Sequence, residues 1–494
     1  MTAALDFDRD DFFGFEDHFH GLMALKKYDA RLIAQTQQAW EDERRFLREV
    51  IAPRVLEEDR KHAADHDHVS WDLLRLAGQH GRLSGFIPKI MGGTGRAAGL
   101  SMPNTEEMAA VDTAYSGMLG GHGLGLVALM MTFNMKVLQR VAQNITAGEK
   151  SENPYVIDCA ITEPTAGTDV EEIELYPRAK LGCQAKPAPG GALLNGRKVF
   201  ISTGHMAADH VILMPFDVKD AVNTYGCFVV PTGAPGFSLG RLERKMGQRA
   251  GPASELIFED CFVPQENIAM SALEFAEPKY RGQFRALLET VLGVTRTAVG
   301  AMSTGAARGA FERALGLART ATHKGRTLIH QQWAQAILTN MFINVMTARS
   351  VYLEAQFALM SNLGMGGAGA AMPGFMNTDF VRTVFQSGPV QKFFQSDWLR
   401  KKMLDRIIDL PADRNARIQT MSSMAKVVGS DAAMENCHLA VEFLSKAGLR
   451  HDRGIEKVFR DAKLLQIFEG TNQLNRLNIF KHTFARRLPG VEVF

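Results

Sequence analysis

A glutamate among apolar neighbours is the residue of this sequence best placed for acid–base chemistry. Glu469 follows an isoleucine and a phenylalanine and precedes a glycine in the segment Gln466-Ile-Phe-Glu-Gly-Thr-Asn-Gln473. Apolar surroundings disfavour an ionised carboxylate, so the pKa of Glu469 should rise toward the range of a base that takes a proton from carbon. A second interpretation stays open, in which Thr471 caps the following helix and Glu469 merely lies near its positive end.

A second segment could bind a flat polar ring or a phosphate. Ala160-Ile-Thr-Glu-Pro-Thr-Ala-Gly-Thr-Asp169 comes at the end of a predicted strand, and its small, hydroxylated and glycine residues leave backbone amides open for hydrogen bonds. An ordinary structural turn is the alternative. Two glycine-rich segments, at 120–125 and 363–375, lack the preceding strand that a dinucleotide-binding loop requires, so a Rossmann site is not predicted.

The chain divides into three regions with different residue patterns, and their helices and strands must position these segments. Apolar residues recur at helical spacing up to about residue 150, short β-branched runs predict strands from 156 to 270, and helical spacing returns beyond 275. We therefore predict an α+β multidomain protein with an N-terminal helical domain (1–152), a middle β-barrel or sheet domain (153–272) and a C-terminal helical bundle (273–494). Asn195-Gly196 is predicted as a two-residue hairpin turn, because both residue types tolerate positive φ.

Composition narrows the possible partners. The 494 residues carry 56 basic and 54 acidic side chains without a long basic run, which argues against a nucleic-acid partner. The acidic start and the lack of about 18 consecutive apolar residues predict neither a secretory signal nor a membrane span, so a cytoplasmic protein is expected. The five cysteines are scattered and never in CxxC spacing, so we expect free thiols and no metal site.

The two segments, taken together, resemble the paired motifs A-x-T-E-P-x-A-G-S/T-D and Y/F-E-G-T-x-Q of the acyl-CoA dehydrogenases, in the same order. The similarity extends over about residues 80 to 485 and includes four further stretches: Leu194-Asn-Gly-Arg-Lys-Val-Phe-Ile-Ser202, Met246-Gly-Gln-Arg249, Phe258-Glu-Asp-Cys-Phe-Val-Pro264 and Arg460-Asp-Ala-Lys463. The resemblance implies a three-domain FAD enzyme that removes an α-proton and a β-hydride from an acyl-CoA thioester.

The resemblance also implies a role for each matching residue. Glu469 would abstract the α-proton while the β-hydrogen passes as hydride to flavin N5, and the backbone amide of Glu469 with a ribityl hydroxyl of FAD would bind the thioester carbonyl. The implied cofactor contacts are Ile161 and Thr162 along the flavin ring, Phe200 and Ser202 on the isoalloxazine, Thr168 at the pyrophosphate or pantetheine, and Thr471 and Gln473 at the adenosine half. Arg296, Phe468 and Gly470 would line the substrate, together with Thr168.

Three departures from the family pattern fall on the ADP half of the FAD site. The R-x-x-F-G stretch of the family corresponds here to Ala321-Thr-His-Lys324-Gly325, and the Q-x-x-G-G-x-G stretch to Glu442-Phe-Leu-Ser445-Lys446-Ala-Gly448. An arginine that would pair with phosphate is lost, and Cβ atoms at 445 and 446 could fill space that glycines leave open. Lys324 or Lys446 could instead supply a replacement charge.

Two assemblies therefore stay open. One is a homodimer or homotetramer that passes electrons to an electron-transferring flavoprotein, and an oxidase using oxygen would share the same base. The other is a subunit of a hetero-oligomer in which a second chain completes the FAD site. The segment from about 362 to 416 is longer than the family needs, and we expect a loop and helix that cover a subunit surface or the acyl pocket; a solvent-exposed insertion is the alternative.

Overall fold

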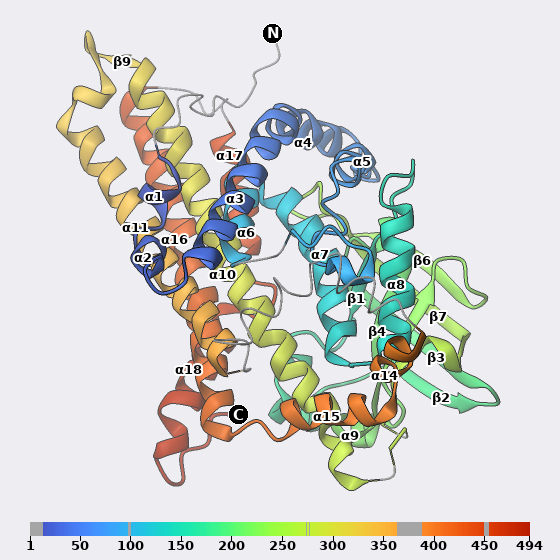
Figure 1. The fold of residues 1–494 in the computed structure, drawn as a ribbon. Coiled ribbons are helices and arrows are strands. Elements are labelled where there is room, and N and C mark those ends of the chain that lie inside the picture. Colours follow the sequence, from blue (N-terminus) through green and yellow to red (C-terminus); the bar gives the residue numbers. More distant parts are fainter. Residues whose placement is uncertain (1–12, 97–99, 273, 276, 363–387, 449–453) are drawn as a thin grey trace.

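The computed structural model describes residues 13–96, 100–272, 274–275, 277–362, 388–448 and 454–494. The strands gather at the right of the view, and the long helices of the C-terminal region lie at the left (Figure 1). The predicted fold class, helical domain, sheet domain and helical bundle, is confirmed. None of the helices in these described ranges is long and apolar enough to cross a membrane.

Some of the N-terminal helices begin at residues whose side chains satisfy free backbone amides. Asp112 caps its helix by accepting hydrogen bonds from the amides of Ala114 and Tyr115 at 2.6 and 3.3 Å, and Asn134 caps the next one through Val137. The helices are α1 (Phe15–His18), α2 (His20–Leu25), α3 (Ala30–Phe46), α4 (Val55–Ala64), α5 (Trp71–Gln79), α6 (Met102–Val111), α7 (Thr113–Met131) and α8 (Met135–Gly148).

Two four-stranded sheets form the middle domain. Their strand orders are β1-β4-β5-β8 and β2-β3-β7-β6, and β1 runs parallel to β4 while the other neighbours are antiparallel. Apolar side chains of both sheets, including Ile212, Phe228 and Leu256, form one core cluster. The strands are β1 (Ile157–Ala160), β2 (Gln184–Ala188), β3 (Gly191–Ser202), β4 (Asp209–Pro215), β5 (Tyr225–Pro231), β6 (Phe237–Leu242), β7 (Ala253–Pro264) and β8 (Ile268–Met270).

The predicted hairpin turn at Asn195-Gly196 is wrong. Strand β3 runs through both residues, and the hairpin with β2 turns instead at residues 189–190, where Gly190 has φ 78°. Asn195 and Gly196 form a bulge against β7, at which the Asn195 side chain bonds Asp260. A Cβ atom at Gly196 would lie 2.6 Å from the Cys183 sulfur, so the glycine permits a close approach and not a chain reversal.

Long helices build the C-terminal domain. Helix α10 (Gln283–Thr320) packs on α16 (Ala412–Ala447), on α11 (Gln332–Asn362) and on α6 of the N-terminal domain. Its Arg308 pairs with Glu106 and Glu107 of α6 at 3.0 and 2.5 Å, so buried ion pairs join the two helical domains. The remaining elements are α9 (Ala221–Thr224), β9 (Thr322–His323), β10 (Arg326–Thr327), α14 (Gly388–Phe394), α15 (Asp397–Ile408), α17 (Ile455–Leu464) and α18 (Asn472–Thr483).

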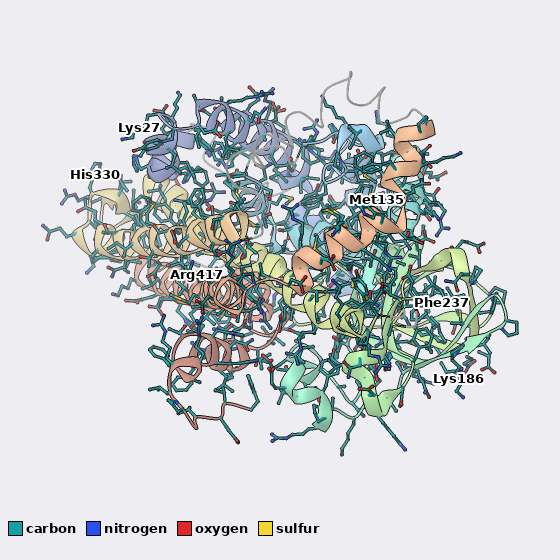
Figure 2. All side chains as sticks on the ribbon, turned by 60° about the horizontal axis from the view of Figure 1, so that its bottom comes forward. Lys27, Met135, Lys186, Phe237, His330 and Arg417 are labelled. Carbon is teal, nitrogen blue, oxygen red and sulfur yellow. The ribbon has the colours of Figure 1, made fainter. Side chains whose placement is uncertain are left out.

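The segment predicted as an insertion is described only in its second half. Residues 363–387 lie outside the described ranges, whereas α14 and α15 run past Met135 at the start of α8 (Figure 2). Arg400 of α15 donates to the carbonyl oxygens of Thr132 and Ala269 at 3.1 and 2.8 Å. The described half therefore packs on the N-terminal and middle domains; whether it covers a pocket or a subunit surface stays a prediction.

The glycine-rich run at 120–125 lies inside helix α7 and not in a loop. Gly125 faces strand β1, and a Cβ atom there would lie 2.5 Å from the carbonyl oxygen of Asp158. Gly120 is exposed on the same helix, with nothing within 4 Å of its Cβ position.

Two alanine substitutions should therefore have opposite effects. Gly125→Ala forces the helix off the sheet and should lower the free energy of unfolding by about 1–3 kcal/mol. Gly120→Ala, the matched control, should raise it by about 0.5–1 kcal/mol through helix propensity. Urea unfolding followed by circular dichroism measures both, and equal shifts of the two midpoints would contradict the close packing of α7 on β1.

Candidate active site

A strained turn between α17 and α18 carries Glu469. Glu469 and Gly470 have φ values of 56° and 76°, so two successive residues adopt the left-handed conformation, which is costly for the glutamate. The side-chain amide of Asn475 holds the turn by donating to the carbonyl oxygens of residues 469, 470 and 471 at 3.2, 2.8 and 3.1 Å. Thr471 caps α18 by accepting from the Leu474 amide, as the alternative interpretation predicts, and Glu469 lies two residues before the cap.

The carboxyl group of Glu469 meets helix α10. Thr295 donates its hydroxyl to Oε2 at 2.7 Å, and Arg296 donates from Nε to the Glu469 carbonyl oxygen at 3.3 Å. Burial raises the pKa of Glu469, while the hydrogen bond from Thr295 and the charges of Arg296 and Lys426 act in the other direction. A carboxyl group whose pKa is raised by burial, and whose partners favour the ionised form, suits general-base chemistry.

Glu171 is a second carboxyl group at this site, and the sequence reasoning missed it. A Cβ atom at Gly470 would lie 3.1 Å from Glu171 Oε2, so the segment after Asp169 touches the turn that carries Glu469. Burial and the neighbouring Glu469 charge raise the pKa of Glu171 to about 8. The available signal was the pair of glutamates at 171–172, which directly follows the second chemical segment.

Lys426 of α16 completes the group of charges. Its ammonium group donates to the side-chain oxygen of Asn472 at 2.6 Å, and burial lowers the pKa of Lys426 to about 7. Two carboxyl groups and two cations therefore share one enclosed site. Such shifts cluster where side chains carry chemistry, although structural ion pairs can also cause them.

A buried ion pair fixes the segment at residues 160–169. Lys198 of β3 lies 2.9 Å from Glu163 and donates to the Ile161 carbonyl oxygen at 2.8 Å, and both charged side chains are fully buried. Glu163 also accepts from the amides of residues 182 and 183. The Val199 amide donates to the Thr162 carbonyl oxygen at 3.0 Å, so the backbone of Ile161 and Thr162 is tied to β3. The segment is therefore a rigid platform.

Phe200 stands on that platform as an exposed aromatic ring. It lies in a bulge of β3, has φ 59° and is 59% exposed, which is unusual for a bulky residue in a strand. Ser202 is exposed two residues further on. The structure thus groups Ile161, Thr162, Phe200 and Ser202 around the ends of β1 and β3.

The surroundings of the remaining predicted residues do not by themselves indicate a function. Thr168 begins a short 3₁₀ turn and is half-buried, Phe468 packs against the C-terminal core, and Gln473 is exposed on the first turn of α18. Ala321 ends α10, Lys324 lies in the β9–β10 turn with φ 51°, and Lys446 pairs with Glu442 at 2.6 Å on α16. Of the two lysines considered as replacements, Lys446 already has an acidic partner.

Models of three protein domains match the chain in consecutive order. The N-terminal, middle and C-terminal domains of acyl-CoA dehydrogenase match residues 34–149, 159–261, and 284–387 with 400–484. The chain belongs to the acyl-CoA dehydrogenase family. This confirms the predicted family and, with it, an oxidoreductase acting on an acyl-CoA.

Curated relatives have names of the same kind. Cyclohex-1-ene-1-carbonyl-CoA dehydrogenase of Syntrophus aciditrophicus is 27% identical over 86% of this chain and 84% of its own length. Cyclohexane-1-carbonyl-CoA dehydrogenase of Geobacter metallireducens is 26% identical over 88% of this chain and 94% of its own length.

Solved structures share the fold. Butyryl-CoA dehydrogenase from Megasphaera elsdenii matches with a TM-score of 0.66 and 21% identity, over 90% of this chain and 97% of that one. An acyl-CoA dehydrogenase from Bacillus anthracis, solved in complex with FAD, matches with a TM-score of 0.67 and 21% identity, over 92% of this chain and 66% of that one.

The Lys198–Glu163 pair generates a stability prediction. Lys198→Met leaves the Glu163 carboxylate buried without its cation and should lower the free energy of unfolding by about 3–5 kcal/mol. Arg197→Met is the matched control on the same strand, because the side chain of Arg197 is 58% exposed and lies 3.5 Å from Glu255. Its effect should stay below about 1 kcal/mol. Chemical denaturation compares the two variants, and equal losses would contradict the anchoring role of Lys198.

Proposed function

We propose that this protein is an FAD-dependent acyl-CoA dehydrogenase that converts an acyl-CoA to the enoyl-CoA, with Glu469 as the base. The observation that carries the proposal is the strained turn at Glu469, whose carboxyl group receives a hydrogen bond from Thr295 and has a raised pKa. Strain of this kind persists only where the surrounding structure holds it, and three carbonyl contacts from Asn475 do so here.

The residues around Phe200 fit a flat cofactor ring. An exposed aromatic side chain on a strained bulge, beside a backbone segment fixed by Lys198, offers a rigid surface for stacking. Ile161, Thr162, Phe200 and Ser202 would hold the flavin ring, Thr168 the pyrophosphate or pantetheine, and Thr471 with Gln473 the adenosine half. The FAD complex of the Bacillus anthracis relative supports this choice of cofactor. When bound, FAD supplies the acceptor for the β-hydride.

The chain's own part in the reaction is proton transfer and orientation. Glu469 takes the α-proton of the thioester, so that the electron pair of the Cα–H bond forms the new double bond as the β-hydrogen leaves with its pair. The Glu469 amide faces the thioester carbonyl and stabilises the charge that develops there. The hydrogen bond from Thr295 favours the ionised form of Glu469, which is the form that acts as a base. Phe468 would line the substrate, whereas Arg296 and Gly470 are buried and would act by holding the turn of Glu469.

The family supports a choice of electron acceptor and of assembly. We propose an electron-transferring flavoprotein as electron acceptor and a homodimer or homotetramer as the working form. The altered positions favour a second candidate, a hetero-oligomer whose other chain completes the FAD site. Ala321 offers no charge, and Lys446 is already paired with Glu442 at 2.6 Å.

Replacing the base separates binding from chemistry. Glu469→Gln keeps the size of the side chain but removes its proton affinity, so an acyl-CoA should still bind while flavin reduction slows by at least about a hundredfold. Stopped-flow absorbance after mixing with a panel of acyl-CoA thioesters measures both events. Glu435→Gln, an exposed position on α16, is the matched control. A Glu469 variant that reduces flavin at the parent rate would remove Glu469 from the proposal.

The FAD contacts are tested by restoring the family residues. Ala321→Arg with Ser445→Gly and Lys446→Gly should tighten FAD binding to the isolated chain, with the arginine–phosphate pair contributing about 1.5–3 kcal/mol. The same variant with methionine at position 321 controls for side-chain length without charge. Calorimetric titration of FAD into apoprotein gives the affinities. Full occupancy and tight binding in the parent chain would contradict the hetero-oligomer.

A further inference from the structure

Glu171 has no role in the reaction proposed above. Its side chain is 14% exposed, its Oε2 is enclosed, and within the described part of the chain that oxygen has no hydrogen-bond partner. The same oxygen lies 3.1 Å from the Cβ position of Gly470, next to the base. A buried polar atom without a partner is rare in folded proteins and asks for an explanation.

Arg296 connects Glu171 to the base. Its Nε donates to the Glu469 carbonyl oxygen at 3.3 Å. The Asn478 amide satisfies both of its ends when its oxygen faces the guanidinium, and in that orientation Nη1 of Arg296 donates to this oxygen at 3.0 Å. Its Nη2 points to Glu171 Oε2, 4.0 Å away, and has no hydrogen bond within the described residues. The guanidinium is 1% exposed and therefore bridges the two segments that carry carboxyl groups.

We infer that Glu171 is a positioning residue of the catalytic site, which acts through Arg296 on the turn of Glu469 and whose own ionisation changes the proton affinity of Glu469. The inference rests on the proposed role of Glu469 as base. Glu171 itself takes no proton from the substrate.

The order of ionisation follows from the contacts. Glu469 has a hydrogen-bond donor in Thr295, whereas Oε2 of Glu171 has no donor among the described residues and lies 4.0 Å from the guanidinium of Arg296, so Glu469 loses its proton first. The charge of Glu469 then opposes the ionisation of Glu171, whose pKa burial and this repulsion raise to about 8. Coupling between two groups is reciprocal, so ionised Glu171 must raise the proton affinity of Glu469 in turn.

The other charged groups that face Glu171 come from each neighbouring element. Arg296 of α10 and Lys426 of α16 favour its ionised form, and Glu469 opposes it. The adjacent Glu172 is paired with Lys481 of α18 at 2.8 Å. Around neutral pH Glu171 is therefore mostly protonated, and above about pH 8 two carboxylates face one guanidinium.

The pH profile of flavin reduction tests the inference in the FAD-loaded protein. Glutamine mimics the protonated carboxyl, so the acid limbs of parent and Glu171→Gln should coincide. Above pH 8 the rate of flavin reduction in the parent should increase by a further factor of about two to five, because a stronger base accelerates proton transfer. The Glu171→Gln variant should lack this increase. Glu171→Asp should keep it. Glu174→Gln is the matched control, since Glu174 lies in the same segment but pairs with Lys481 at 2.6 Å.

Thermal unfolding without substrate gives a readout independent of activity. The folded protein holds the Glu171 proton up to about pH 8, whereas the unfolded chain releases it near the ordinary glutamate pKa. This group therefore costs the parent stability as the pH rises between those values. The melting temperature of Glu171→Gln relative to the parent should rise through that range and level off above it.

The outcomes separate the inference from the proposed function. If none of the acyl-CoA thioesters in the panel reduces the flavin of the parent protein, the proposed function is contradicted. The melting curves then test the ionisation of Glu171 alone. A parent that reduces flavin, with a variant profile lowered by one constant factor or unchanged at every pH, overturns the inference. A melting-temperature difference that does not vary with pH overturns it as well.

Discussion

The catalytic arrangement depends on one strained turn. Glu469 and Gly470 take left-handed backbone conformations one after the other, and this places the carboxyl group against α10 instead of leaving it on the helix surface. A non-glycine residue in that conformation costs free energy, which the contacts of Asn475 and Arg296 offset. The neighbouring helices are therefore required to hold the proposed base in position as much as to form a core.

Long helices provide that rigidity. Thr295 and Arg296 lie on α10, which is 38 residues long, and Lys426 lies on α16, which is 36 residues long and packs along it. Since α10 also joins the N-terminal domain through Arg308, the groups around Glu469 are fixed by contacts far from the site. Side chains held on packed helices are more precisely placed than side chains on free loops.

Local sequence patterns predicted the elements but not their pairing. The helical spacing beyond residue 275 and the β-branched runs of the middle region correspond to helices and strands of the structure. The hairpin at Asn195 failed because turn propensity is local, whereas the register of β3 is set by its long pairing with β7. The glycines at 120–125 belong to a helix because the close approach of α7 to β1 requires a small residue at Gly125.

The site was predictable only where a motif spans it. The turn of Glu469 and the platform of Ile161 belong to contiguous segments, so their residues could be named in advance. Glu171 lies just outside its motif, and its importance comes from a contact with Gly470, almost 300 residues away in sequence. No periodicity or turn rule encodes such a contact, because packing of the middle domain on the C-terminal helices creates it.

The buried charged side chains differ in how well they are paired, and this difference distinguishes groups that stabilise the fold from groups that could take part in chemistry. Glu106 receives hydrogen bonds from Arg349 and Tyr352 at 2.6 Å each, and these partners lower the pKa of Glu106. The ionised form of such a fully paired carboxylate is favoured, and the group serves the fold. Burial instead moves the pKa values of Glu171 and Lys426 to about 8 and 7, because their opposite charges only partly compensate for it. Two groups that can gain or lose a proton near neutral pH therefore lie beside Glu469, which is typical of a functional site.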